Sequence, residues 1–205
     1  MKHTLLAALL AVTACLGTAA IGASAPQTYS SKPEYDSLFE QLVHTDVIVE
    51  GRARSTHVLY VFFDANCYYC NLTWKALRPY LKAGLQVRWV PVAYQQASSA
   101  GRAAAILAAR DRVAALRANE TKYNAAHYDG GIEPQAQVSA KLSASLADNT
   151  RLMQTFGAPG TPALVWKDPQ GSIRFKVGMP RLSELPAITG LPEQKITDRE
   201  LRVYR

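Results

Sequence analysis

Two cysteines separated by two tyrosines, Cys67 and Cys70, lie where one hydrophobic pattern gives way to another. Residues 58–63 form an unbroken apolar and aromatic run, which is typical of a strand buried on both faces. After Cys67 the apolar residues recur at Cys70, Trp74, Leu77 and Leu81, which is helical spacing. The sequence therefore predicts a strand, a short turn and a helix, with Cys67 at the helix N-terminus.

This placement predicts a reactive thiol. The unpaired N–H groups and the dipole at a helix N-terminus favour an anion. Such surroundings lower the pKa of a cysteine thiol from about 8.5 to roughly 3.5–7.5. Cys70 follows one helical turn later and lies within disulfide reach. We therefore expect a redox pair, with Cys67 as the nucleophile and Cys70 as the resolving thiol.

Two other roles for the cysteine pair are less favoured. A zinc site would need two further ligands, and a bridge that closes so short a loop would constrain little of the unfolded chain. No second paired motif is present among the remaining candidates, which are Cys15, His3, His44, His57 and His127. The prediction is accordingly no metal and no organic cofactor.

The first 25 residues predict an export signal, because a positive start precedes an apolar stretch too short to span a bilayer. Two processing routes are open. Residues 12–15 resemble a bacterial lipobox, in which Cys15 becomes lipidated, whereas small residues further on permit ordinary cleavage. Either route predicts a periplasmic protein, in a compartment where disulfides persist. Contact with the membrane surface is expected only if Cys15 carries lipid.

The remaining length is sufficient for one domain with its own core. We expect a lead-in over residues 26–45, a catalytic domain over 46–190 and a basic tail over 191–205. The net charge of +7 is spread along the chain. This spread indicates a solvated basic surface and not a nucleic-acid site.

Hydrophobic periodicity and turn residues predict an α/β layer with a helical insertion. Strands are expected at 47–49, 58–63, 85–92, 163–166 and 173–177, and helices at 33–42, 67–82, 99–118, 135–147, 149–156 and 182–188.

The element order and residues 61–70 resemble the thioredoxin fold, and specifically the catalytic domain of the DsbC/DsbG periplasmic disulfide isomerases. Residues 104–108, 148–157 and 161–163 match the DsbG side best. The resemblance extends from about residue 47 to 188. It implies a thioredoxin fold with a helical insertion, in which Cys67 and Cys70 form the redox-active disulfide.

The resemblance also places the family's cis-proline loop at Thr161-Pro162. Proline removes an N–H donor beside the thiols, and the backbone of Thr161 can pair with a substrate strand. Together with Tyr68 and Tyr69, this loop is expected to form an apolar groove for extended or unfolded polypeptides that carry thiols or disulfides. A membrane redox partner is expected as well.

Two departures from the family pattern affect the prediction. The family carries an N-terminal dimerisation domain, for which about twenty residues between signal and first strand leave no room, so we expect a monomer. Tyr68-Tyr69 stands where relatives have Gly-Tyr or Pro-Tyr. Since the intervening pair tunes the reduction potential, the direction of electron flow stays open between oxidase, reductase and isomerase.

The sequence thus favours an exported protein thiol–disulfide oxidoreductase, and rescue of sulfenylated cysteines would use the same residues. The alternative is a thioredoxin-like chaperone or assembly factor without redox turnover, whose partner surface would include Tyr123, His127 and Tyr128.

Three other residues are expected to be structural. Asp64 is more readily interpreted as a turn or helix cap than as a proton acceptor. Trp74 and Trp89 are expected to be core aromatics.

Overall fold

The computed structural model describes residues 32–205. The predicted export signal and the predicted lipidation site at Cys15 lie outside the described residues. No helix within the described range has both the length and the apolar character that a membrane crossing requires.

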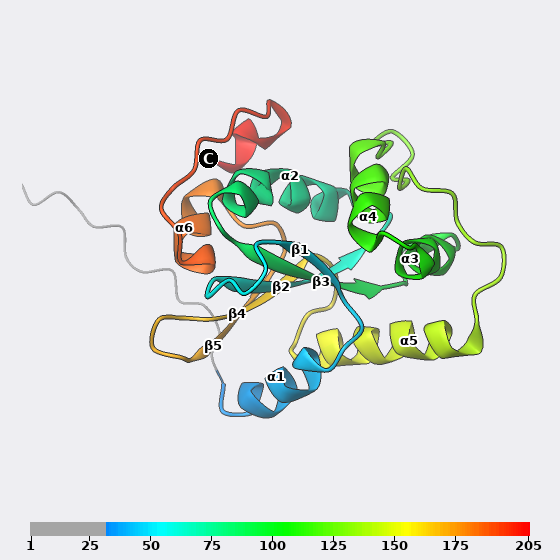
Figure 1. Cartoon of the computed structure of the whole chain (residues 1–205), viewed down its shortest axis with the longest axis horizontal. Coiled ribbons are helices and arrows are strands. Elements are labelled where there is room, and N and C mark those ends of the chain that lie inside the picture. Colours follow the sequence, from blue (N-terminus) through cyan, green and yellow to red (C-terminus); the bar gives the residue numbers. More distant parts are fainter. Residues whose placement is uncertain (1–31) are drawn as a thin grey trace, which may run out of the picture.

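The centre of the molecule is a five-stranded mixed sheet with strand order β1-β3-β2-β4-β5 (Figure 1). β2 and β3 are parallel, and every other neighbouring pair is antiparallel. The strands are β1 (Ile48–Gly51), β2 (Val58–Asp64), β3 (Gln86–Val92), β4 (Ala163–Lys167) and β5 (Ile173–Val177).

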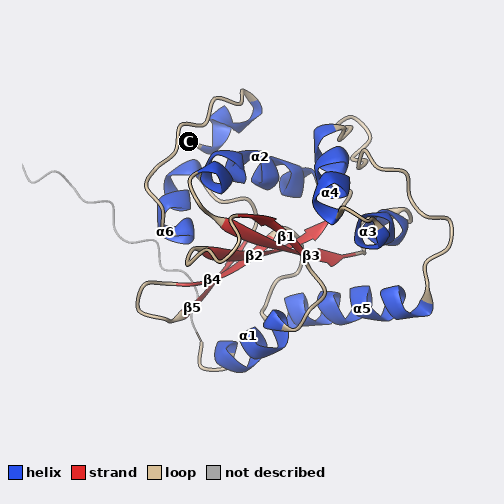
Figure 2. Cartoon of the chain, in the orientation of Figure 1, coloured by secondary structure: helices blue, strands red, loops and turns tan. Residues whose placement is uncertain are grey.

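Helices cover both faces of this sheet (Figure 2). Helices α2 and α6 lie on one face, and α1 and α5 lie on the other (Figure 1). The helices are α1 (Tyr35–Val43), α2 (Tyr68–Lys82), α3 (Ser99–Ala108), α4 (Arg112–Thr121), α5 (Ala140–Thr155) and α6 (Leu185–Thr189), with 3-10 turns at Leu182–Glu184 and Glu200–Tyr204.

The central strand β2 is buried on both faces, as its continuous apolar run predicted. Leu59, Val61 and Phe63 pack into the core beneath α2, whereas Tyr60 and Phe62 pack into the second core beside α1 and α5. The alternation follows from the two-residue period of a strand. The predicted thioredoxin fold with a helical insertion is confirmed.

The prediction of one helix over residues 99–118 was wrong, because the helix is interrupted at residues 109–111, between α3 and α4. Ala109 has an extended backbone, and the Asp111 side chain accepts a hydrogen bond from Ala114 N at 2.9 Å. An aspartate at this position satisfies one of the unpaired N–H groups at the start of α4. The cap therefore starts a second helix in a new direction.

The prediction of two helices over 135–147 and 149–156 was also wrong, since α5 is continuous and begins only at Ala140. Ser139 caps it by accepting from Leu142 N at 3.3 Å. Asn149 does not end a helix; its buried side chain donates to Pro91 O at 2.9 Å. A tertiary hydrogen bond thus accounts for a residue that the pattern assigned to a boundary.

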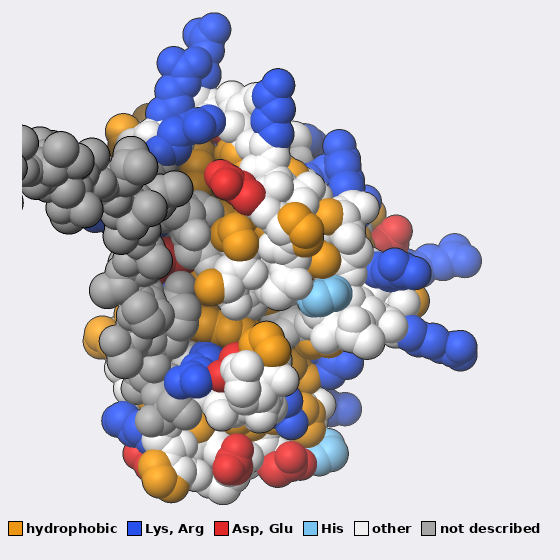
Figure 3. All heavy atoms as spheres, turned by 90° about the vertical axis from the view of Figure 1, so that its left-hand side faces the viewer, with side chains coloured by type: hydrophobic (Ala, Val, Ile, Leu, Met, Phe, Trp, Pro, Cys, Tyr) orange, Lys and Arg blue, Asp and Glu red, His pale blue; other side chains and the backbone are white. Residues whose placement is uncertain are grey.

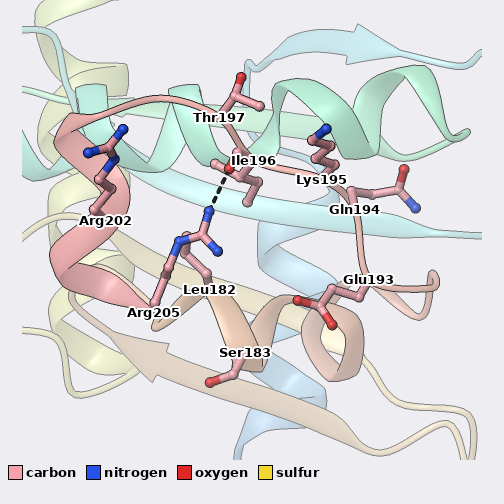
Figure 4. Close-up of a pocket in the computed structure, with 9 residues that line it drawn as sticks. All are labelled: Leu182, Ser183, Glu193, Gln194, Lys195, Ile196, Thr197, Arg202 and Arg205. Atoms are coloured by element: carbon pink, nitrogen blue, oxygen red, sulfur yellow. Dashed lines mark hydrogen bonds between the residues drawn. The ribbon is translucent and has the colours of Figure 1, made fainter.

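The C-terminal segment packs on α2 and is part of the folded body. Leu201 is buried in the core beneath α2, Lys75 pairs with Glu200, and Gln194 N donates to Tyr80 Oη at 3.4 Å. This segment borders a hollow of about 760 Å³, in which Arg205 Nη2 donates to Ile196 O at 2.9 Å (Figure 4).

The basic residues do not gather into a single block on the face of the molecule that Figure 3 shows. On the face shown in Figure 3, lysine and arginine side chains are scattered among neutral and acidic ones. This distribution agrees with the solvated basic surface that the sequence predicted.

Candidate active site

Cys67 lies at the point where β2 passes into α2, and it is the N-cap residue of that helix. Its Sγ accepts a hydrogen bond from Cys70 N at 3.2 Å, and its own N–H donates to Asp64 O at 2.9 Å. The predicted strand, turn and helix are therefore confirmed. The helix continues through Pro79 to Lys82.

Both cysteines are free thiols and almost fully buried, with 2% of Cys67 and 1% of Cys70 exposed. Their protonation nevertheless differs. The pKa of Cys67 is lowered to about 7, and the hydrogen bond from the Cys70 side chain contributes most to this shift. Hydrogen bonds from Thr161, the Cys70 N–H and Gln95 make smaller contributions. Burial raises the pKa of Cys70 well above its ordinary value. Cys67 is thus the thiolate of the pair near neutral pH.

The loop that precedes β4 lies directly against the nucleophile. The Thr161–Pro162 peptide bond is cis, as the family resemblance implied. Cys67 Sγ lies 3.4 Å from Thr161 O. The two residues are 94 positions apart in the chain. The fold thus brings the predicted thiol and the predicted loop together.

The two tyrosines between the cysteines lie in different environments. Tyr68 is half-buried, and its ring contacts those of Tyr69, Tyr123 and Tyr128 at centroid distances of 5.6, 6.3 and 6.1 Å. Tyr69 is largely exposed. The chain therefore places an aromatic cluster beside Cys67, and the groove predicted for Tyr68 and Tyr69 stays a prediction.

Asp64, the last residue of β2, is a buried anchor for the loops around the thiols. Its Oδ1 accepts from Asn66 N at 2.9 Å and from Ser99 Oγ at 2.8 Å. Its Oδ2 accepts from Tyr94 N at 2.9 Å and from Gln95 N at 3.1 Å. These contacts agree with a structural role for Asp64, and they hold the β3–α3 loop next to Cys67.

That loop contributes two residues which the sequence did not single out. Thr161 N donates to Tyr94 Oη at 2.7 Å, and Gln95 Nε2 donates to Thr161 Oγ1 at 3.2 Å. Both side chains reach the segment before the cis-proline from the loop after β3, a strand that lies on the other side of β2 from β4. Sequence position alone carries no indication of this contact.

The helical insertion is docked on the turn before Cys67 through polar contacts. Tyr123 Oη donates to Asn66 O at 2.8 Å, Gly130 N donates to Asn66 Oδ1 at 3.0 Å, and Asn119 Nδ2 donates to Ala65 O at 3.0 Å. Tyr123 therefore helps to fix the turn that precedes Cys67. His127 and Tyr128 remain on the surface.

A buried carboxyl group lies behind the thiols. Glu120 is 3% exposed, and its oxygens accept from Asn71 Nδ2 at 2.9 Å and from Asn119 Nδ2 at 3.0 Å. The pKa of Glu120 is raised to about 7, mainly by burial, and the negative charge of Cys67 is a smaller cause of the same rise. No sequence pattern marked Glu120, because it lies in a polar stretch of α4, and such a stretch is typical of a helix surface exposed to solvent.

The two tryptophans occupy the core, as predicted. Trp74 and Trp89 are both buried, and Trp89 Nε1 donates to Glu50 Oε2 at 3.1 Å. Within residues 32–205, no group of three or more His, Cys, Asp or Glu side chains is placed to hold a metal ion.

The site thus combines a cysteine at the N-cap of the helix after the central strand with a cis-proline loop beside its sulfur. A family model described as a thioredoxin-like domain matches residues 46–188. The chain belongs to this thioredoxin-like family. It is also similar to proteins named thiol:disulfide interchange protein DsbG, with 31% identity to the one from Pseudomonas aeruginosa and 28% to the one from Escherichia coli.

Both alignments cover 77% of this chain but only 60% and 62% of the two relatives, so the chain spans about 60% of their length. Among solved structures, the catalytic domain of Proteus mirabilis ScsC superposes with a TM-score of 0.57 at 20% identity. That match covers 77% of this chain and 93% of the other. It shows a shared thioredoxin-like fold.

Proposed function

We propose that this protein is a thiol–disulfide oxidoreductase that exchanges disulfides with polypeptide substrates through Cys67 and Cys70. The observation that carries the proposal is the position of Cys67 Sγ, which accepts the Cys70 N–H at 3.2 Å and lies 3.4 Å from Thr161 O. The Cys70 N–H favours a thiolate at Cys67, beside a backbone segment that can pair with an extended chain.

In the reducing direction, the Cys67 thiolate attacks one sulfur of a substrate disulfide and releases the other as a thiolate. This step forms a mixed disulfide between Cys67 and the substrate. Cys70 then loses its proton and attacks Cys67 Sγ, which forms the Cys67–Cys70 disulfide and releases the second substrate thiol. The oxidising direction reverses these steps. The high pKa of Cys70 keeps it protonated until the mixed disulfide exists.

The similarity to DsbG supports a polypeptide substrate. The exposed ring of Tyr69 and the Thr161-Pro162 loop are proposed to receive the substrate chain. The N-terminal pattern of residues 1–25 supports export to the periplasm, with a lipid anchor if Cys15 is the processed residue. A membrane redox partner and a monomeric state are part of the same proposal.

Trapping of the reaction intermediate tests the proposal. Cys70→Ala should accumulate mixed disulfides through Cys67 when it is mixed with a disulfide-bonded protein, and mass spectrometry after acid quenching should detect them. Cys67→Ala is the matched control, because it keeps the buried thiol and removes the nucleophile. If Cys70→Ala forms no mixed disulfide, the chain is a binding protein without redox turnover.

A titration of the wild-type protein against glutathione then gives the direction of electron flow. A potential near about −120 mV indicates an oxidant, and one near about −270 mV indicates a reductant.

A further inference from the structure

The backbone N–H of Thr161 is already occupied in the structure. It donates to Tyr94 Oη at 2.7 Å, and the same Oη lies 3.1 Å from Thr161 Oγ1. Because Oη accepts the amide hydrogen, its own hydrogen is free to point to Thr161 Oγ1. Tyr94 thus contacts Thr161 at the very N–H group that an extended substrate would need.

The backbone of Tyr94 is anchored to a buried carboxylate, whereas its side chain is held at the hydroxyl by Thr161 and is otherwise exposed. Tyr94 N donates to the buried carboxylate of Asp64 at 2.9 Å, which anchors the loop. Tyr94 is 42% exposed, so rotation of its side chain into solvent would leave no cavity in the core. The contact is therefore one that a competing hydrogen-bond acceptor can displace.

Gly160 lets the phenol lie across the loop. A Cβ atom at this position would be 3.2 Å from Tyr94 Oη, which is closer than nearly all such contacts. An alanine at Gly160 would therefore require the hydroxyl or the loop to shift by a few tenths of an ångström, which disturbs the contact with Thr161. The glycine and the tyrosine together build the contact.

We propose that Tyr94 is a specificity-determining gate, whose hydroxyl stands in for a substrate carbonyl oxygen on Thr161 N–H until an extended polypeptide displaces it. The inference rests on the proposed function, in which the substrate pairs with Thr161. A polypeptide must exchange the Tyr94 hydrogen bond for its own. A small disulfide without peptide groups reaches Cys67 without this exchange.

Two disulfides with the same leaving thiol test the gate. One is a fluorescent peptide of about ten residues whose central cysteine is joined to 2-mercaptoethanol, and the other is bis(2-hydroxyethyl) disulfide. Each oxidises the reduced protein to the Cys67–Cys70 disulfide and is itself reduced to two thiols. Stopped-flow tryptophan fluorescence, calibrated by mass spectrometry, measures both second-order rate constants.

Tyr94→Phe should raise the rate constant for the peptide by about two- to tenfold, the range expected for one net hydrogen bond. The rate constant for the small disulfide should stay the same. Gly160→Ala should act in the same direction while it keeps the hydroxyl. Tyr35→Phe is the matched control on the opposite face of the sheet, where its hydroxyl donates to Phe156 O, and it should change neither rate constant.

An unchanged or slower reaction of Tyr94→Phe with the peptide would overturn the gate. Equal changes with both disulfides would overturn it as well, because they would show an effect on the Cys67 thiol itself. If the wild-type protein reacts with neither disulfide, the proposed function fails and the gate fails with it.

Discussion

Replacement of Glu120 by glutamine should change how the stability of the protein depends on pH. The buried carboxyl has its pKa raised to about 7, mainly by burial, whereas in the unfolded chain it ionises near 4.5. A group with a raised folded pKa contributes stability that is fully present below 4.5 and is lost as pH rises through 7. At about 1.36 kcal/mol per pH unit, this gap corresponds to about 3 kcal/mol.

Glutamine has the same shape as the neutral acid and does not ionise. The amide nitrogen of glutamine cannot accept the hydrogen bond that Asn71 or Asn119 donates to the carboxyl, so Glu120→Gln should be less stable than wild type at pH 4.5. The difference between the two free energies of unfolding should shift in favour of the variant as pH rises, by about 3 kcal/mol between pH 4.5 and pH 8. Most of this difference should develop between pH 4.5 and 7, since that is the window in which only the unfolded chain ionises.

Urea denaturation under reducing conditions, followed by tryptophan fluorescence, measures both proteins across this range. Effects of titrating groups that do not interact with Glu120 cancel in the difference between them. Glu133→Gln is the matched control, because it makes the same substitution at an exposed carboxyl group. A difference for Glu120→Gln that is constant with pH would refute the reasoning, since Glu120 would then ionise near its ordinary value.

Three further predictions follow from the same structure. The rate of alkylation of Cys67 by iodoacetamide, measured by peptide mass spectrometry, should rise with pH and show an inflection near pH 7. In Cys70→Ala the inflection should move to higher pH, because the hydrogen bond that contributes most to the low pKa is gone. An inflection near pH 9 in the wild type would contradict this assignment. Asp64→Asn should lower the free energy of unfolding by about 2 kcal/mol or more in urea, since one amide oxygen cannot replace two carboxylate oxygens that accept four hydrogen bonds. Leu77→Ala should cost about 2–5 kcal/mol in the same assay, because Leu77 is a fully buried residue on the inner face of α2. A smaller loss would show that the core closes around the cavity.

Local patterns in the sequence predicted the elements whose environment is uniform along their length. The run at residues 58–63 is apolar on both sides, so its strand could be read from composition alone. The turn at residues 167–171 joins β4 and β5, as its proline and glycine predicted. The break between α3 and α4 before Asp111, and the continuity of α5 through Asn149, could not be predicted in this way. Each depends on where one polar side chain finds its partner.

The candidate site shows the same division. Cys67 and Cys70 are three residues apart, so their spacing and the adjoining strand were sufficient to identify them. Glu120 contacts Asn71, which is 49 positions away in the chain. Tyr94 contacts Thr161, which is 67 positions away. No local period connects residues that far apart.

The sequence by itself determined a strand, a helix that begins at Cys67 and a thiol in the position where a negative sulfur is favoured. Those features depend on nearest neighbours along the chain and on backbone geometry. Only the tertiary structure decided that burial raises the pKa of a carboxyl group behind the thiols to about 7, and that Tyr94 occupies the N–H of Thr161. The physical reason is that burial and hydrogen-bond partners are properties of the packed chain, and the fold brings them together across the sheet.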